Sequence, residues 1–213
     1  MKYENKNKGY YENSRTEMQK LLPPNIKTVL DIGCGNGTFA NSIKNSKKIE
    51  VWGVELMSNE ANIASEKLDK VINKKVEDAI DKLPDNYFDV IYFNDVLEHV
   101  SYPDTILKEI KIKLKQNGVV ISSIPNVRYH SAMYNFLFKK DWKYAKSGVM
   151  DYTHLRFFTS KSIKRMYMNA GYSIVHHKGI NKTKSIKPYF LNILFLFTAF
   201  DMFYLQFATI AKK

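Results

Sequence analysis

Three glycines and two acidic residues near the start of the 213-residue chain are spaced to hold a small ligand. The glycines are Gly33, Gly35 and Gly37. They separate a short apolar run around Asp31 from renewed helical spacing, which predicts a strand, a turn and a helix. Such a turn lets a ligand lie against bare backbone, and the helix start offers unpaired N–H groups. Glu55 ends the next apolar run, where a carboxylate can accept both hydroxyls of a ribose. The residues therefore predict a nucleoside site.

The spacing of the glycines discriminates between nucleosides. A dinucleotide pyrophosphate takes G-x-G-x-x-G, whereas this turn is one residue shorter and follows Asp31. A carboxylate there would repel pyrophosphate but suits the ammonium group of an amino acid. The pattern resembles motif I of the class I S-adenosylmethionine (AdoMet) methyltransferases, and Glu55 matches the family's ribose-binding acid. The resemblance, which runs from about Tyr10 to Ala211, implies AdoMet as the cofactor.

The same resemblance implies where AdoMet lies. Its methionine end would cover the glycine turn, its adenine would lie beside Val76 and Glu77, and its sulfonium near Asn94 and Asp95. Arg15, on an N-terminal helix over 10–22, would help to close the site. The implied cofactor contacts are Arg15, Asp31, Gly33, Gly35, Gly37, Glu55, Leu56, Val76, Glu77, Asn94 and Asp95.

Methyl transfer to a hydroxyl also needs a base, because the hydroxyl loses its proton at or near attack. The candidate bases are His154, Asp95, His99 and His130. Asp95, Glu98 and His99 would share a helix face, and they resemble an acid-x-x-Glu-His pattern that one branch of quinone-precursor O-methyltransferases associates with a divalent metal. A polar first turn explains the same residues, and Asp95 has a short reach. We therefore expect no metal.

The acceptor site is expected in a long insertion over 128–159, since long loops in compact domains tend to bind or cover ligands. Its aromatic residues alternate with lysines, which suits either a sugar face or a small satellite core. Residues 151–159, Asp-Tyr-Thr-His-Leu-Arg-Phe-Phe-Thr, resemble a segment of bacterial methyltransferases associated with glycan and glycolipid synthesis. We expect His154 to act as the base and Arg156 and His130 to bind the acceptor. The alternative is that this segment only ties the insertion to the sheet.

Strands alternate with helices along the whole chain, which predicts a single α/β domain over 1–213 with helices on both faces of a mostly parallel sheet. Strands are expected near 27–32, 50–55, 71–73, 88–93, 118–124, 172–177 and 206–212. One helix is expected from Pro103 through Leu114, closed by Gly118, and another near 160–170 with Thr159 as its N-cap. The family resemblance implies a Rossmann-like, seven-stranded sheet whose last strand is antiparallel and lies beside the sixth.

The amino-acid composition limits the cellular compartment and the partners of the protein. A single cysteine, Cys34, allows no internal disulfide and suits a reducing cytoplasm. The N-terminus is charged and lacks the apolar stretch of a signal peptide. The net charge is +12, yet we see no zinc cluster or nucleic-acid motif and expect no nucleic-acid partner.

A segment rich in Phe, Leu and Ile covers residues 189–207. Its polar residues and the final strand leave too little apolar length for a spanning helix, which needs ~20 residues. We expect an apolar helix near 190–203. It could pack on the sheet, form a homodimer contact, or rest on the inner face of a membrane beside Lys182, Lys184 and Lys187.

These inferences converge on an AdoMet-dependent methyltransferase that O-methylates a sugar, a glycan or another small hydroxylated metabolite. Two alternatives are an NAD-dependent oxidoreductase and a non-catalytic AdoMet-binding module. Asp31 and the short glycine turn argue against the first. The intact segment over 151–159 argues against the second.

Overall fold

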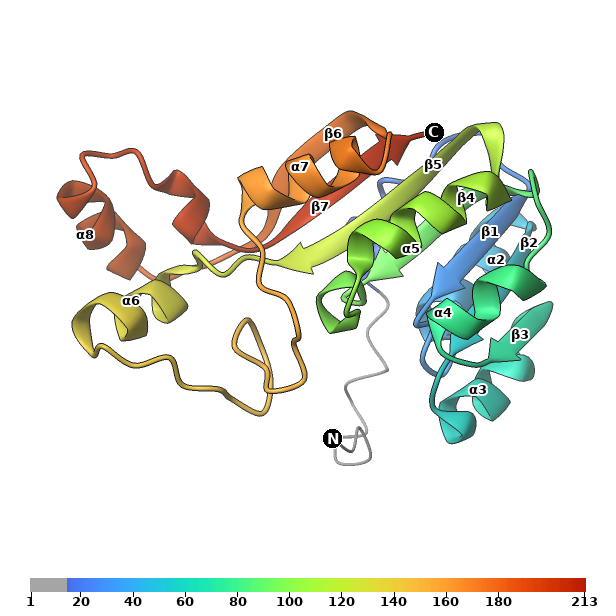
Figure 1. The fold of residues 1–213 in the computed structure, drawn as a ribbon, viewed down its shortest axis with the longest axis horizontal. Helices are drawn as coiled ribbons and strands as arrows, with labels where there is room; N and C mark the ends of the chain where they lie inside the picture. The colour runs from blue at the N-terminus through green and yellow to red at the C-terminus, as the bar shows by residue number, and fades with distance from the viewer. Residues whose placement is uncertain (1–14) are drawn as a thin grey trace.

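The computed structural model describes residues 15–213 and contains one seven-stranded sheet (Figure 1). The strands are β1 (Thr28–Ile32), β2 (Glu50–Glu55), β3 (Lys70–Asn73), β4 (Phe88–Asn94), β5 (Leu114–Pro125), β6 (Ser173–Lys182) and β7 (Tyr204–Lys212). Their order is β3-β2-β1-β4-β5-β7-β6. The first five strands are parallel, and β7 pairs antiparallel with both β5 and β6.

Helices cover both faces of the sheet. The α-helices are α1 (Thr16–Gln19), α2 (Thr38–Lys47), α3 (Ser58–Ser65), α4 (Val76–Ala79), α5 (Pro103–Ile110), α6 (His130–Phe138), α7 (Ser160–Asn169) and α8 (Lys187–Leu194). The 3₁₀ helices are η3 (Ile80–Lys82), η4 (Leu97–His99), η5 (Lys111–Lys113) and η6 (Phe200–Phe203). The Rossmann-like α/β prediction is confirmed, including the antiparallel last strand beside the sixth.

The core has two halves because neighbouring strand residues point to opposite faces. Along β4, Ile91 and Phe93 pack with α4, α5 and α7, whereas Val90 and Tyr92 pack with α1, α2 and α3. Burial on both faces explains the nearly continuous apolar runs of the central strands. Because β1 pairs in parallel with both β2 and β4, the polar residues at the ends of these three strands share one edge.

The chain around Gly118 differs from the sequence prediction. The helix stops at Ile110, and β5 begins at Leu114, four residues before Gly118. The pairing of β5 with β4 is irregular there, and a Cβ on Gly118 would lie 3.0 Å from the carbonyl oxygens of Lys115 and Phe88. The glycine therefore permits an irregular strand pairing; it does not cap a helix. Thr159, in contrast, caps α7 in a capping box with Ser162, as predicted.

The two terminal helical predictions also need adjustment. Within the described residues the N-terminal helix is α1, a single turn over Thr16–Gln19, and the predicted part over 10–14 lies outside them. The single apolar helix predicted near 190–203 is two short helices, α8 and η6. They are separated by Leu196 and Phe197, which adopt left-handed backbone conformations with φ values of 49° and 58°. Among the described residues, no helix is long and apolar enough to cross a membrane.

Candidate active site

A cavity of about 820 Å³ opens where the parallel strands end. Eleven of the sequence-predicted residues line it, namely Arg15, Asp31, Gly33, Gly35, Glu55, Leu56, Val76, Glu77, Asn94, Asp95 and His99. Gly37 is the exception among the predicted cofactor contacts. It begins α2 with a φ of 76°, and a Cβ there would lie 3.2 Å from Ala64. Its role in the structure is to let α2 approach α3 closely.

The glycine turn leaves backbone exposed to the cavity. Gly33 and Gly35 have φ values of 71° and 53°, which favour glycine. A Cβ on Gly33 would lie 2.6 Å from a methyl carbon of Val96. Beside them, burial raises the pKa of the Cys34 thiol well above its usual value. Cys34 is therefore a protonated packing residue, not a nucleophile.

The carboxylate of Glu55 is fixed by the backbone of two neighbouring loops. One oxygen accepts a hydrogen bond from the Gly35 N–H and the other from the Met57 N–H, each at 2.8 Å. Burial raises the pKa of Glu55, and these hydrogen bonds oppose the increase. Each carboxylate oxygen can accept more than one hydrogen bond. The side chain can thus hold the glycine turn and still receive ribose hydroxyls.

Asp31 is the most deeply buried of the acids that line the cavity, with 3% of its surface exposed. Burial raises its pKa to about 8, and repulsion from Glu55 adds to the increase. One of its carboxylate oxygens has no hydrogen-bond partner among the described residues. A cationic ligand group would neutralise this carboxylate. The ammonium of AdoMet has the required charge.

Asp95 is held by residues from three distant parts of the chain. It accepts hydrogen bonds from Arg15, Ser123 and Gln206. Gln206 in turn accepts a hydrogen bond from Asn181 at 2.7 Å. Gln206 and Asn181 line the cavity but were missed by the sequence analysis. The sequence could have revealed them only through their place at the cavity end of β6 and β7. That place depends on the antiparallel insertion of β7.

Asn94 precedes Asp95 and ends β4. Its side-chain oxygen and nitrogen are both buried and have no hydrogen-bond partner among the described residues. The amide also lines the cavity. An unsatisfied buried amide is costly, so a polar ligand group at this position would stabilise it.

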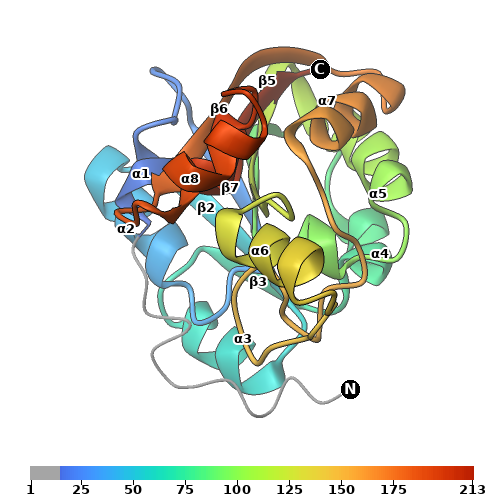
Figure 2. The same cartoon turned by 90° about the vertical axis from the view of Figure 1, so that its left-hand side faces the viewer.

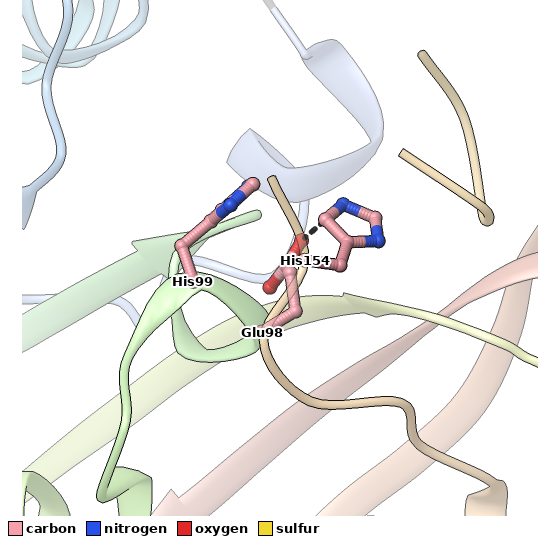
Figure 3. A group of neighbouring side chains, drawn as sticks. All are labelled: Glu98, His99 and His154. Atoms are coloured by element: carbon pink, nitrogen blue, oxygen red, sulfur yellow. Dashed lines mark ion pairs between the residues drawn. The ribbon is translucent and has the colours of Figure 1, made fainter. Parts of the chain in front are cut away.

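Glu98, His99 and His154 form a compact group beside the cavity (Figure 3). The Nδ1 of His99 lies 3.0 Å from the Thr153 carbonyl, and the Nδ1 of His154 lies 3.0 Å from the Val149 carbonyl. Because a carbonyl only accepts, each Nδ1 carries a hydrogen. The Nε2 of His154 lies 4.0 Å from Glu98.

The two histidines of this group differ in their access to the cavity. His99 lines it, whereas His154 is only 8% exposed and is not among the described residues that do. This location argues against the prediction that His154 is the base, since a base must reach the acceptor hydroxyl. His99, in contrast, lies on the cavity wall.

A divalent cation has one candidate ligand set here. Ligand atoms of Glu98, His99 and His154 lie within 4.8 Å of one another. The set considered from the sequence was different, because it took Asp95 in place of His154. That set assumed a regular helix, but Asp95 has a left-handed backbone with a φ of 55° and η4 begins only at Leu97. The carboxylate of Asp95 bonds to Arg15 and Gln206 instead.

The two predicted acceptor-binding residues make other contacts. His130 begins α6 and is 8% exposed, and burial and Lys187 lower its pKa. Arg156 donates two hydrogen bonds to the Ser101 carbonyl, at 3.1 and 2.7 Å. Neither residue is among the described ones that line the cavity. From the segment over 151–159, Leu155 is the residue that reaches the lining, and its N–H donates to the Glu98 carbonyl.

Comparisons with known proteins agree with this geometry. A family model described as a methyltransferase domain matches residues 6–177. A ubiquinone biosynthesis O-methyltransferase of Neisseria meningitidis serogroup C is 26% identical over 164 residues, which are 72% of this chain and 67% of that protein. A mitochondrial ubiquinone biosynthesis O-methyltransferase of Candida albicans is 30% identical over 122 residues. That match covers 54% of this chain and 37% of the Candida protein, so the chain spans little more than a third of it.

The fold has close structural counterparts. A SAM-dependent methyltransferase from Archaeoglobus fulgidus superposes with a TM-score of 0.68 at 20% sequence identity. The superposition covers 93% of this chain and 92% of that one.

Proposed function

Since the chain belongs to the methyltransferase-domain family and AdoMet is its cofactor, we propose that it transfers the AdoMet methyl group to a hydroxyl oxygen of a small acceptor. Family membership decides against the NAD-dependent oxidoreductase. A non-catalytic AdoMet-binding module is also disfavoured, because the cavity extends beyond the cofactor residues to His99, Ser101 and Leu155.

In the proposed complex, AdoMet spans the cavity from the glycine turn to α4. Its ammonium faces Asp31, whose unpartnered buried oxygen supports this assignment. Its ribose hydroxyls bond to Glu55, and its adenine lies between Leu56 and the start of α4 at Val76 and Glu77. The methyl group then points to the side of the cavity lined by Asn94, Asp95 and His99.

The acceptor oxygen attacks the methyl carbon in line with the departing sulfur. Bound AdoMet would supply the methyl group: the C–S bond would break as the C–O bond forms, and the sulfur would leave as a neutral thioether. Positioning and exclusion of water supply most of the acceleration. The Nε2 of His99 takes the hydroxyl proton, and the Thr153 carbonyl fixes the orientation of the ring. Asp95 orients Arg15 and Gln206, since its carboxylate is already bound to both.

The observation that carries this proposal is the position of His99, which lies on the cavity wall at the end of η4. Two acceptor classes have support. The resemblance of residues 151–159 to glycan-associated methyltransferases favours a sugar or glycan hydroxyl. The names of the Neisseria and Candida relatives favour a hydroxylated aromatic precursor.

A transfer assay with methyl-labelled AdoMet tests both classes. The panel contains a nucleotide sugar, a dihydroxybenzoate and, as a nitrogen control, an aromatic amine. We expect label on oxygen, and we expect His99→Ala to lower turnover by roughly 10²–10⁴ without changing AdoMet affinity. Labelling of the amine alone, or full activity of His99→Ala, would refute the proposal.

We propose that the protein works in the cytoplasm on a small-molecule acceptor and without nucleic acid. The single cysteine and the absence of a nucleic-acid motif support this setting.

A further inference from the structure

Helices α6 and α8 lie at the same end of the molecule (Figure 2). Large apolar side chains on and just after these helices are exposed. Six of them define what we call the α6–α8 face: Phe136, Phe138, Phe190, Ile193, Leu196 and Phe197. Leu196 is 83% exposed and Phe190 is 65% exposed. Several exposed apolar residues on neighbouring elements mark an interaction site more often than isolated apolar residues do.

The inward-facing side chains of α6, α8 and η6 already pack against one another. Leu191, Ala199 and Met202 form a small buried cluster, with Met133 of α6 packed against it. The residues of the α6–α8 face are outside this cluster. Between the two short helices, Leu196 and Phe197 are held in left-handed backbone conformations that non-glycine residues rarely adopt. The chain thus accepts local strain where it exposes two apolar side chains.

The charge next to this face is strongly positive. Segments 139–146 and 182–187 flank it with seven exposed lysines and one acid, Asp141. Two copies of the face brought together would oppose lysine to lysine, and protein interfaces are depleted in lysine. An anionic lipid surface complements both features, because aromatic and aliphatic side chains enter the interface while lysines meet the headgroups.

The face also lies on the side of the molecule to which the strands β4 and β5 point (Figure 1). The chain passes from β5 into α6 and from η6 into β7, whose residues Leu205 and Gln206 line the cavity. The exposed apolar surface is therefore connected by a few residues to the cavity wall.

We propose that the α6–α8 face docks on a membrane surface containing anionic phospholipids. Phe190, Leu196 and Phe197 enter the boundary between headgroups and acyl chains, and the flanking lysines bind the phosphate groups. The inference concerns binding alone, so it holds or fails independently of the acceptor assigned above.

Vesicle binding and tryptophan fluorescence test it on the full chain. Vesicles are made of phosphatidylcholine alone or of phosphatidylcholine with phosphatidylglycerol. The chain has two tryptophans. Trp142 lies beside Phe136 in the insertion, and Trp52 lies on β2 against Phe88. We expect binding to the anionic vesicles, with quenching of Trp142 by brominated lipid. In Trp142→Phe the remaining Trp52 signal should be unquenched.

Two matched triple variants separate this face from general surface hydrophobicity. Phe190→Ser/Leu196→Ser/Phe197→Ser should weaken vesicle binding by about tenfold or more. Ile112→Ser/Met168→Ser/Val175→Ser removes exposed apolar residues elsewhere and should bind like the wild type. Thermal unfolding of both variants checks that they fold.

The lysines supply a second comparison. Binding should weaken in 1 M salt, where the screening length falls from ~10 Å to ~3 Å, and in Lys139→Gln/Lys140→Gln/Lys184→Gln/Lys187→Gln. Three results would overturn the proposal. They are a lack of binding to anionic vesicles, equal binding by the face variant and the wild type, and a concentration-dependent dimer that the face variant abolishes.

Discussion

Replacing Asp31 by asparagine tests the most specific electrostatic feature of the site. The pKa of Asp31 is raised from 3.8 to about 8 by burial and by Glu55. At pH 7 about nine tenths of the free protein therefore carries a proton on this group. The ammonium of AdoMet favours the ionised form, so binding should expel that proton. We expect release of about 0.9 proton per ligand at pH 7.

Calorimetry measures this release directly. Binding of the demethylated product, S-adenosylhomocysteine, is recorded in phosphate and in Tris, whose ionisation enthalpies differ. The difference in observed heat gives the number of protons released. Asp31→Asn has no proton to release and should bind more weakly by roughly 1.5–3 kcal/mol, the scale of a hydrogen bond to a charged group.

The raised pKa of Asp31 also affects the stability of the free protein. Because the folded state holds a proton that the unfolded chain loses, stability should fall as pH rises from about 4 to 8. At pH 7 the accumulated loss attributable to Asp31 is at most about 4 kcal/mol. Asp31→Asn should remove this slope and be the more stable protein at pH 8. Absence of proton release in the wild type, or an unchanged slope in the variant, would refute the reasoning.

Four further outcomes follow from the site. Glu55→Ala should weaken AdoMet binding by roughly 1.5–3 kcal/mol in calorimetry, while NAD shows no binding to the wild type. His154→Ala should lower the thermal midpoint, because it removes a neighbour of buried Glu98. It should reduce turnover far less than His99→Ala does, and equal losses of turnover in the two variants would assign the role of base to His154 again. Turnover should survive EDTA and desalting, since His99 can accept the proton unaided, and a loss that Mg²⁺ restores would instead assign a cation to Glu98, His99 and His154. Gly53→Ala should cost about 1–3 kcal/mol in denaturant unfolding, because its Cβ would lie 2.6 Å from the Cys34 sulfur.

The cofactor half of the site was predictable because each of its parts is local in sequence. Asp31 and the glycines follow one another across a single strand and turn, and Glu55 ends the next strand. Parallel neighbours bring those ends to one edge without further information. Gly118 shows the limit of local signals. A glycine after an apolar helical pattern indicates a C-cap, but the same residue permits an irregular strand pairing, and only the register of β5 on β4 distinguishes the two.

The acceptor half could not be predicted in the same way, since its residues come from remote segments. Gln206 reaches Asp95, and Asn181 reaches Gln206, only because β7 inserts between β5 and β6. The metal-like spacing of Asp95, Glu98 and His99 misled for a related reason. It presumes one regular helix, whereas the left-handed Asp95 turns its carboxylate toward Arg15. The sequence favoured His154 over His99 as the base, whereas of the two only His99 is among the described residues that line the cavity.

This division has a consequence for how acceptor specificity can vary. The glycine turn and Glu55 brace each other through the 2.8 Å bond between Gly35 and Glu55, so a change in one disturbs the other. The segment over 151–156 meets the site differently. The backbone N–H groups of Leu155 and Arg156 donate to the Glu98 carbonyl, and the Arg156 guanidinium donates to the Ser101 carbonyl. Backbone contacts of this kind do not depend on the side chain of Leu155, the one member of the segment that lines the cavity. A substitution at Leu155 can therefore alter the acceptor surface while the base, the cofactor residues and the support of η4 remain in place.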